Sequence, residues 1–241
     1  FHIHSSAPEI VRRSKYLIFW YNHHAFIFFY LLLFVHMVQK ETYFEQFFPY
    51  AIVPVLMYTG ERIMRIMRGT RPVMIKRVKY IPPVLELHLE PVGSWFKFKE
   101  GQYLYLNIPH IDPNLGELFS SWHPFTISSA MGDLKEKTEK DRFVSLHIKV
   151  WPGGWTEKLK NYLELMNPND SYPMTFTRRD EYGAQKLGKI LGPDNKPLIR
   201  IDGPHASPSQ HYDEYKTLML VGVGVGMTPC ASILRGILLY V

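Results

Sequence analysis

The sequence predicts a mixed fold, with two transmembrane α-helices, an antiparallel β-barrel and the start of an α/β domain. Three observations carry this prediction: a long apolar run from Tyr16 to Val38, alternating apolar and polar residues from position 84, and an apolar run that enters a glycine-rich turn near position 222. The corresponding parts are 1–70 (membrane helices), 71–162 (barrel), 163–200 (loop or insertion) and 201–241 (start of the α/β domain).

The first span, Tyr16 to Val38, has the length and composition of a transmembrane helix. About 20 apolar residues at 1.5 Å each cross the hydrocarbon core of a bilayer. The strongly polar side chains in this run are Asn22, His23, His24 and His36. Because imidazoles at that depth cost free energy, they are expected to have a function, and neutral imidazole is a common ligand of haem iron.

His23 and His36 are separated by thirteen positions. That separation is about 20 Å along a helix axis, which suits axial ligands to two haems, one above the other. On an ideal helix the two side chains would point about 140° apart, so each would face its own haem or the helix would be distorted. His24 is the rival to His23. The alternative is that these imidazoles bind neighbouring helices or lie at the membrane interface.

A second span is predicted from about Phe47 to Met64, after a polar connection at 39–46. Its apolar stretch is short, because Glu61 and Arg62 enter before a full crossing. We therefore expect the helix to continue into the interface, with Arg62 and Arg65 reaching toward lipid headgroups.

The net charge of +6 is concentrated at the ends of the predicted spans rather than in a nucleic-acid motif. By the positive-inside rule, residues 1–15 and everything after 66 are expected in the cytoplasm, and no nucleic-acid partner is expected. The lone Cys230 excludes an internal disulfide. The chain begins with Phe1 and is expected to be a fragment that is inactive alone. The cations next to the spans are Arg12, Arg13, Lys15, Arg62, Arg65, Arg68, Arg71, Lys76, Arg77 and Lys79.

Short strands are predicted after the membrane segment. Residues 84–90 alternate apolar and polar side chains, as a half-buried strand does. Glycine, proline and asparagine separate the runs, which is typical of a small antiparallel barrel. A tight turn at Gly153 and Gly154 then opens a short helix, with Thr156 as its N-terminal cap. The other predicted strands are 101–108, 124–129 and 142–151.

The last segment changes character again. Tyr215 to Gly222 is an apolar run, predicted as a buried strand of a parallel sheet. It enters a turn with Gly222, Gly224 and Gly226, and a helix follows from Cys230. A strand, a glycine-rich turn and a helix start together present backbone N–H groups to a phosphate. The glycine spacing differs from the dinucleotide fingerprint, and the alternative is a tight connection.

Taken in order, the motifs of this chain closely resemble the catalytic subunit of the NADPH oxidases, which generate superoxide. The resemblance implies two membrane helices next to a cytoplasmic ferredoxin-reductase-like unit, with an FAD-binding barrel and an NADPH-binding α/β domain, in an integral, multi-pass membrane protein. The motifs that carry it are Trp20-Tyr-Asn-His-His-Ala-Phe26, His36, Tyr58-Thr-Gly-Glu-Arg-Ile-Met-Arg65, Gly101-Gln-Tyr103, Trp122-His-Pro-Phe-Thr-Ile-Ser-Ser-Ala130, His147-Ile-Lys149, Gly154-Trp-Thr-Glu157, Asp202-Gly-Pro204 and the run from Leu220 to Leu234.

The resemblance also implies roles for single residues. Phe125 would lie by the isoalloxazine of FAD and Thr126 would hydrogen-bond near its reactive nitrogen, so these two are the expected catalytic residues. Lys149 stands where the family usually has arginine, near the FAD pyrophosphate, and loses the bidentate fork. The full expected set is His123, Pro124, Phe125, Thr126, Lys149, Gly154, Trp155 and Thr156 for FAD, Gly203, Pro204, Gly222, Gly224, Gly226, Thr228 and Pro229 for NADPH, and His23 (or His24) with His36 for two b haems.

Three departures from the family pattern accompany this set. The main one is that the chain is expected to begin after the helix that supplies the partner haem histidines and to end before the rest of the NADPH site and the part that covers the flavin. His205 and Ala206 stand where an aromatic residue and a glycine are usual, and the turn with Pro152 is longer by one residue.

The implied function is transmembrane electron transfer from cytosolic NADPH through FAD and two haems to molecular oxygen, in a lipid bilayer and with regulatory subunits as further partners. A ferric-chelate reductase is the second candidate. Twelve residues between His23 and His36 resemble the oxidases, whereas the reductases typically have thirteen. A third candidate is a non-catalytic membrane scaffold that retains the fold.

Overall fold

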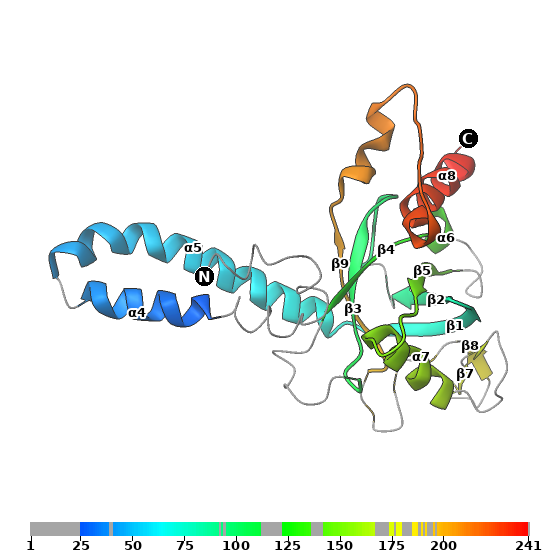
Figure 1. Cartoon of the computed structure of the whole chain (residues 1–241), viewed down its shortest axis with the longest axis horizontal. Helices are drawn as coiled ribbons and strands as arrows, with labels where there is room; N and C mark the ends of the chain where they lie inside the picture. The colour runs from blue at the N-terminus through cyan, green and yellow to red at the C-terminus, as the bar shows by residue number, and fades with distance from the viewer. Residues whose placement is uncertain are drawn as a thin grey trace. The chain divides into compact units, whose positions relative to one another are not determined.

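The computed structural model forms two compact units, Phe1–Ile63 and Met64–Val241, shown as a cartoon in Figure 1. The structure describes residues 25–38, 41–91, 93, 95–111, 122–135, 142–166, 174–175, 177–179, 185–187, 189, 191, 195 and 197–240.

The first unit contains α4 (Phe26–Val38) and most of α5 (Glu41–Gly69). None of the helices within the described residues combines the length and the apolar character that a membrane crossing requires. His36 lies in the last turn of α4 and is exposed. His23 and His24 lie outside the described residues, as do most of the other residues before α4. The predicted second span falls inside α5, which begins earlier and ends later than expected.

One sheet of the second unit has the strand order β5-β2-β1-β6, all antiparallel. The alternation that predicted a strand at 84–90 is confirmed, because Leu85, Leu87 and Leu89 of β2 are fully buried. The sequence prediction named no strand at β1, which the structure forms. The strands are β1 (Val73–Ile81), β2 (Val84–Pro91), β5 (Val144–Lys149) and β6 (Met174–Thr175).

The other sheet has the order β4-β3-β9. It contains β3 (Tyr103–Asn107), β4 (His123–Thr126) and β9 (Arg200–His205). A bridge between Ile127 and Leu146 joins it to β5 of the first sheet. The prediction of a closed barrel is not met within the described residues, because β6 and β9 share no ladder there. Closure needs every strand paired on both sides, and β6 is only two residues long.

The inner faces of both sheets and one helix form a single core. Leu104, Leu106 and Ile201 of the second sheet pack with the buried leucines of β2. Leu159 and Leu163, four residues apart on α7 (Trp155–Leu165), close this core. A short helix, α6 (Met131–Lys135), follows the bridge. The core thus holds β4, the end of β5 and the start of α7 in one place.

The segment 163–200 was predicted as a loop or insertion, and this is wrong in part. It contains β6 and the hairpin of β7 (Thr177–Arg179) and β8 (Gln185–Leu187). Leu198 and Ile199 at its end are buried in the core. Strands of two or three residues are too short to show a period, so composition alone could not reveal them.

The predicted strand at 215–222 is also not formed. The segment lies between the 3₁₀ helix η2 (Pro208–Glu214) and a 3₁₀ turn η3 (Gly224–Met227), and it has no ladder partner among the described residues. Met219 is 88% exposed and Val221 is 73% exposed. A strand exists only through backbone pairing, so apolar composition predicts the tendency and not the partner. Helix α8 (Thr228–Tyr240) follows directly.

Arg65 was predicted to reach toward lipid headgroups. It belongs to the second unit, and there it pairs with a buried carboxylate instead. Its Nε lies 3.0 Å from Oδ2 of Asp202, whose side chain is 1% exposed. The guanidinium also lies over the ring of Tyr105, 5.6 Å from its centre. Because a buried carboxylate requires a compensating charge, Asp202 is what turns Arg65 toward β9.

Candidate functional site

Aromatic rings from β4 and α7 stack on one another. The ring of His123 lies 4.0 Å from that of Trp155, with 27° between the planes. Phe125 is also stacked on Trp155, at 6.2 Å and 26°. Side chains two apart on a strand share one face, which is why both rings meet the first residue of α7. All three are only half-buried, so the cluster is open to a planar ligand.

A tight turn joins β5 to α7. The backbone N–H of Trp151 donates to Oγ1 of Thr156 at 2.9 Å, and the N–H of Gly154 donates to the carbonyl of Trp151 at 3.1 Å. Gly153 has φ of +71°, a left-handed conformation that favours glycine. Its N–H donates to Oε2 of Glu157 at 2.7 Å.

The prediction that Thr156 is the N-terminal cap of the helix is therefore wrong. Gly154 holds that position with no side-chain cap. The hydroxyl of Thr156 already accepts the N–H of Trp151 within the turn, so it serves the connection and not the helix end.

Lys149 is the last residue of β5, beside this turn. Its Nζ lies 4.1 Å from the centre of the Trp151 ring. The start of α7 adds a second positive feature. The first N–H groups of a helix have no acceptor within the helix, and they carry the positive end of its dipole. An ammonium and a helix start within one turn fit an anionic group, and the stacked rings fit an aromatic one.

The other two residues of the predicted motif also lie on β4. Pro124 is exposed, and Thr126 is half-buried opposite Tyr103 of β3. The residues present therefore fit a ligand with a planar part and a diphosphate, as FAD has. No distance between Thr126 and such a ligand follows from the fold.

Tyr103 links the β4 motif to the region of Gly203 and Pro204. It is the Cα partner of Thr126 on one side and of His205 on the other. The ring of His205 stacks on Tyr103 at 5.5 Å, and its Nε2 lies 3.3 Å from Oδ2 of Asp202. Sequence reasoning missed Tyr103 as a site residue, although Tyr103 and Tyr105 repeat at strand spacing.

Gly203 is required by its surroundings. It has φ of +146°, and a Cβ there would lie 3.1 Å from Cβ of Leu104. Strand β3 lies between β9, which carries Gly203 and Pro204, and β4, which carries His123. The structure therefore places Gly203 and Pro204 against β3 rather than in the His123–Trp155 stack.

The glycine-rich turn contacts β5. A Cβ on Gly222 would come within 2.7 Å of Sδ of Met227, and Gly224 has φ of +57°. A Cβ on Gly226 would meet nothing within 4 Å. Oγ1 of Thr228 donates to the carbonyl of Val225 at 2.9 Å, at the start of α8. Pro229 follows in the first turn, where its missing N–H is tolerated.

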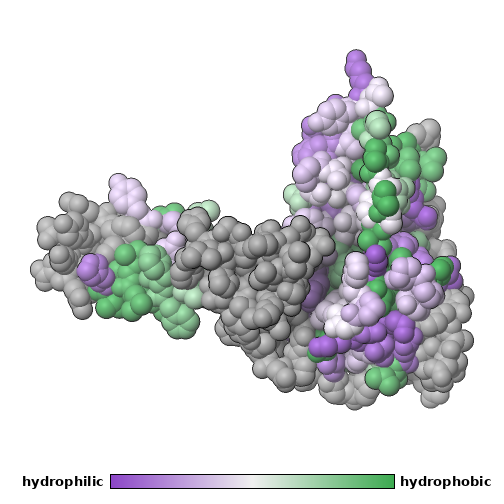
Figure 2. All heavy atoms as spheres, in the orientation of Figure 1, coloured by the Kyte–Doolittle hydropathy of each residue, from purple (hydrophilic) through white to green (hydrophobic). Residues whose placement is uncertain are grey.

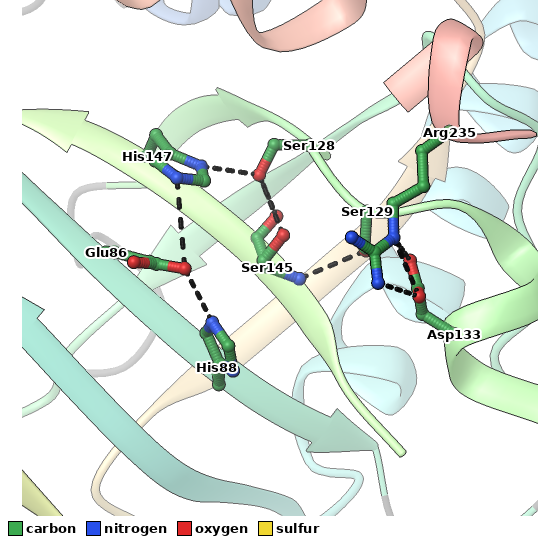
Figure 3. Close-up of polar contacts among 8 residues, drawn as sticks. All are labelled: Glu86, His88, Ser128, Ser129, Asp133, Ser145, His147 and Arg235. Carbon is green, nitrogen blue, oxygen red and sulfur yellow. Dashed lines mark hydrogen bonds and ion pairs between the residues drawn. The ribbon is translucent and has the colours of Figure 1, made fainter. Parts of the chain in front are cut away.

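A titratable cluster on β2 and β5 was not predicted (Figure 3). Nε2 of His88 donates to Oε1 of Glu86 at 2.7 Å. The hydrogen bond from His88 lowers the pKa of Glu86. His147 lies with Nδ1 2.7 Å from Oγ of Ser128 and Nε2 3.9 Å from Glu86.

Burial is the main cause that lowers the pKa of His147, and the charge of Glu86 opposes it. The signal that could have revealed this cluster is the alternation itself, which puts Glu86 and His88 on one face of β2.

A family model described as an FAD-binding domain matches residues 71–209. That range contains β4, β5 and the start of α7. It therefore covers every residue of the aromatic cluster and the turn.

Curated relatives match nearly the whole chain. Of two superoxide-generating NADPH oxidase heavy chains of Dictyostelium discoideum, one is 38% identical over 98% of this chain and 40% of its own length. The other is 37% identical over 96% of this chain and 30% of its own length. The respiratory burst oxidase homolog protein D of Solanum tuberosum is 36% identical over 91% and 23%. The chain thus spans less than half the length of these relatives.

Among solved structures, a ferredoxin NADP+ reductase from Neisseria gonorrhoeae with bound FAD and NADP covers 69% of this chain and 50% of its own. The two chains are 14% identical and superpose with a TM-score of 0.39.

Proposed function

The chain belongs to the FAD-binding domain family, and from that premise we propose that it carries the flavin step of a superoxide-generating NADPH oxidase. In this proposal electrons pass from cytosolic NADPH to FAD and then through two membrane haems to molecular oxygen. FAD supplies the conversion of a two-electron hydride donor into single electrons. The chain itself supplies binding, orientation and charge.

The junction of β4, β5 and α7 carries the FAD proposal. Trp155 is the observation on which it rests, because one residue both stacks on His123 and begins the helix whose N-terminus faces the turn. His123, Pro124, Phe125 and Thr126 would line the isoalloxazine. Lys149, Gly154, Trp155 and Thr156 would hold the diphosphate.

The segment 201–241 is proposed to begin the NADPH-binding domain. Its extended run before η3 exposes Met219 and Val221, and apolar strands of that kind are normally covered on both faces in α/β domains. Gly203, Pro204, Gly222, Gly224, Gly226, Thr228 and Pro229 would serve the nucleotide. Gly203, Gly222 and Gly224 are the glycines of this set whose backbone or packing requires glycine.

Residues 1–70 are proposed to belong to the haem-binding membrane part, with the second unit in the cytoplasm. The first unit carries an apolar surface (Figure 2), on which Phe28 and Leu32 are each 70% exposed and Met57 is 72% exposed. Lipid is the environment in which such a surface is stable. His36 and His23, with His24 as the rival, would bind the haems.

The decisive experiment uses the protein at its full natural length, purified in detergent. Flavin absorbance after reconstitution tests the FAD site, and haem spectra of the His23→Leu, His24→Leu and His36→Leu variants test the ligands. We expect bound FAD and loss of one haem signal with His36→Leu. A protein that takes up no FAD even in excess supports the scaffold instead.

The acceptor needs its own measurement, because a ferric-chelate reductase would use the same relay. Superoxide formation and Fe(III) reduction by the same preparation, with NADPH as donor, separate the two. The match to proteins named as superoxide-generating favours oxygen.

A further inference from the structure

One face of α8 is joined to the flavin domain. Ser232, Arg235, Gly236 and Leu239 recur at the i, i+3, i+4 and i+7 spacing of a single helix face. Leu238, off this face, is 78% exposed. Each member of the face has its own contact with residues between 100 and 133, so α8 is oriented by several points and not by one.

Arg235 makes the strongest of these contacts, with Asp133 (Figure 3). Its Nε lies 2.8 Å from Oδ1 and 2.6 Å from Oδ2 of Asp133, and the terminal Nη2 lies 2.6 Å from Oδ1. Asp133 is only 4% exposed. It also accepts the N–H of Ala130 at 2.9 Å, so the carboxylate has a second, local partner that holds its orientation. The planar guanidinium suits such a contact better than an ammonium would.

Two further contacts place the same helix face. Oγ of Ser232 donates to the carbonyl of Ser129 at 2.7 Å and accepts the N–H of Gly101 at 3.4 Å. Gly236 lies so close to Glu100 that a Cβ would come within 2.7 Å of its Cγ. Glu100 in turn accepts the N–H of Met131 at 3.0 Å, beside Asp133. These bonds leave α8 little freedom to rotate about its own axis.

The orientation of α8 also sets the position of the glycine-rich turn, because η3 ends directly before the first residue of α8. Arg235 follows Thr228 by seven positions, which is about two helical turns. A helix of this length is stiff, so holding it at Ser232 and Arg235 also holds the turn at its N-terminus.

We propose that Asp133 and Arg235 are positioning residues that hold the glycine-rich turn, and the nucleotide bound there, at a fixed place relative to the flavin. This inference rests on the proposed function. Neither residue is assigned a contact with the cofactor. The side chain of Asp133 is 5% exposed whereas that of Arg235 is 53% exposed, so Arg235 compensates a buried carboxylate from the solvent side of the contact.

Two measurements test the proposal in the full-length protein. The first is a spin-label distance between Leu238→Cys and Ile81→Cys, with and without Arg235→Met, in a background in which Cys230 and any other native cysteine of the full-length protein are replaced by alanine. The second is the stopped-flow rate of flavin reduction by NADPH, with FAD content recorded for every variant. Lys97→Met is the matched control, since Lys97 is an exposed cation that takes no part in the contacts described above.

We expect Arg235→Met to broaden the distance distribution and to retain FAD. We expect the apparent affinity for NADPH or the rate of flavin reduction to fall about tenfold, because small misplacements of reacting groups have effects of that order or more. Arg235→Lys should recover part of the loss, and dithionite should reduce the flavin of every variant equally.

An unchanged distance distribution would show that Arg235 does not fix α8 against residues 100–133. An unchanged NADPH reaction in a variant with a broadened distribution would show that this contact does not position the nucleotide. If Arg235→Met fails to fold, Ser232→Ala and Arg235→Lys are judged by the same two criteria. If NADPH does not reduce the flavin of the unsubstituted protein, the proposed function fails. The distance measurement still shows whether Arg235 fixes α8 against residues 100–133.

Discussion

The ammonium of Lys149 lies 4.1 Å from the centre of the Trp151 ring. The backbone N–H of Trp151 in turn donates a hydrogen bond to the hydroxyl of Thr156 in the first turn of α7. A lysine has a flexible stem and no fork, so its position needs an external constraint. The indole provides one, even though it is exposed. The position that this chain fills with lysine is thus supported by a ring two residues away.

The first prediction concerns the charge at Lys149. Lys149→Ala should weaken FAD binding by about tenfold or more, because a hydrogen bond to a charged group contributes ~1.5–3 kcal/mol. Lys149→Arg should bind at least as tightly as the unsubstituted protein. Titration of the apoprotein with FAD, followed by flavin fluorescence, measures both. Lys97→Ala is the control, and an equal loss in Lys97→Ala would remove the special role of Lys149.

The second prediction separates Trp151 from general packing. Trp151→Leu should weaken FAD binding by a factor of roughly two to five, which corresponds to the ~0.5–1 kcal/mol of an exposed cation–π contact. In the Lys149→Ala background the same substitution should have almost no effect, because the partner is gone. The same titration in the four variants of the cycle gives the coupling. Equal losses in both backgrounds would contradict it.

The third prediction compares two glycines with left-handed φ. A Cβ on Gly153 would meet nothing, whereas a Cβ on Gly101 would lie 2.9 Å from the backbone of Ser209. Gly153→Ala should therefore cost only the conformational strain, about 1 kcal/mol of unfolding free energy. Gly101→Ala should cost more, roughly 2–4 kcal/mol, because overpacking adds to the strain. Urea unfolding measures both, with Gly226→Ala as a near-neutral control. The reverse order of the two would refute the steric argument.

The fourth prediction concerns the buried pair of Lys76 and Glu90. Nζ of Lys76 lies 2.7 Å from Oε2 of Glu90, and the two side chains are 2% and 9% exposed. Nζ also donates to the carbonyl of Arg142 at 2.8 Å. Lys76→Met should destabilise the domain by about 3–5 kcal/mol, since it leaves an unpaired buried carboxylate. Adding Glu90→Leu should recover much of that loss in thermal or urea unfolding. Simple additivity of the two losses would show that the pair is not coupled.

The fifth prediction is the pH dependence of stability. The pKa of His147 is lowered in the folded state by burial, so the unfolded chain binds this proton more readily and stability falls as the pH drops below about 6.5. The pKa of Glu86 is lowered by its hydrogen bond with His88, so a second loss begins below about 4.3. Unfolding in urea from pH 8 to pH 3 should show both phases.

His147→Gln should remove the first phase of that pH dependence and leave the second. His211→Gln is the matched control, because His211 is exposed and, within the part of the chain that the structure describes, hydrogen-bonds to Gln210 and Glu214 of the η2 region. If His211→Gln also removed the first phase, that phase could not be attributed to His147.

The strands that carry the candidate site were predictable from local pattern. Alternation identified β2, and the runs around His123 and His147 marked β4 and β5. The helix after Gly154 followed from the turn residues before it. These predictions succeeded because each depends on side chains within a few positions of one another, where the period of two or the turn chemistry is visible.

What the amino-acid order alone determined was most of the local elements and the residue types at the candidate site. The fold decided the partners: Arg65 with Asp202, Trp151 with Lys149 and Thr156, and Asp133 with Arg235 from the far end of the chain. Among the described residues, it also left the apolar run at 215–222 without the strand partner that its composition favours. Local pattern records what a segment can form, whereas a contact between distant segments depends on how the whole core packs.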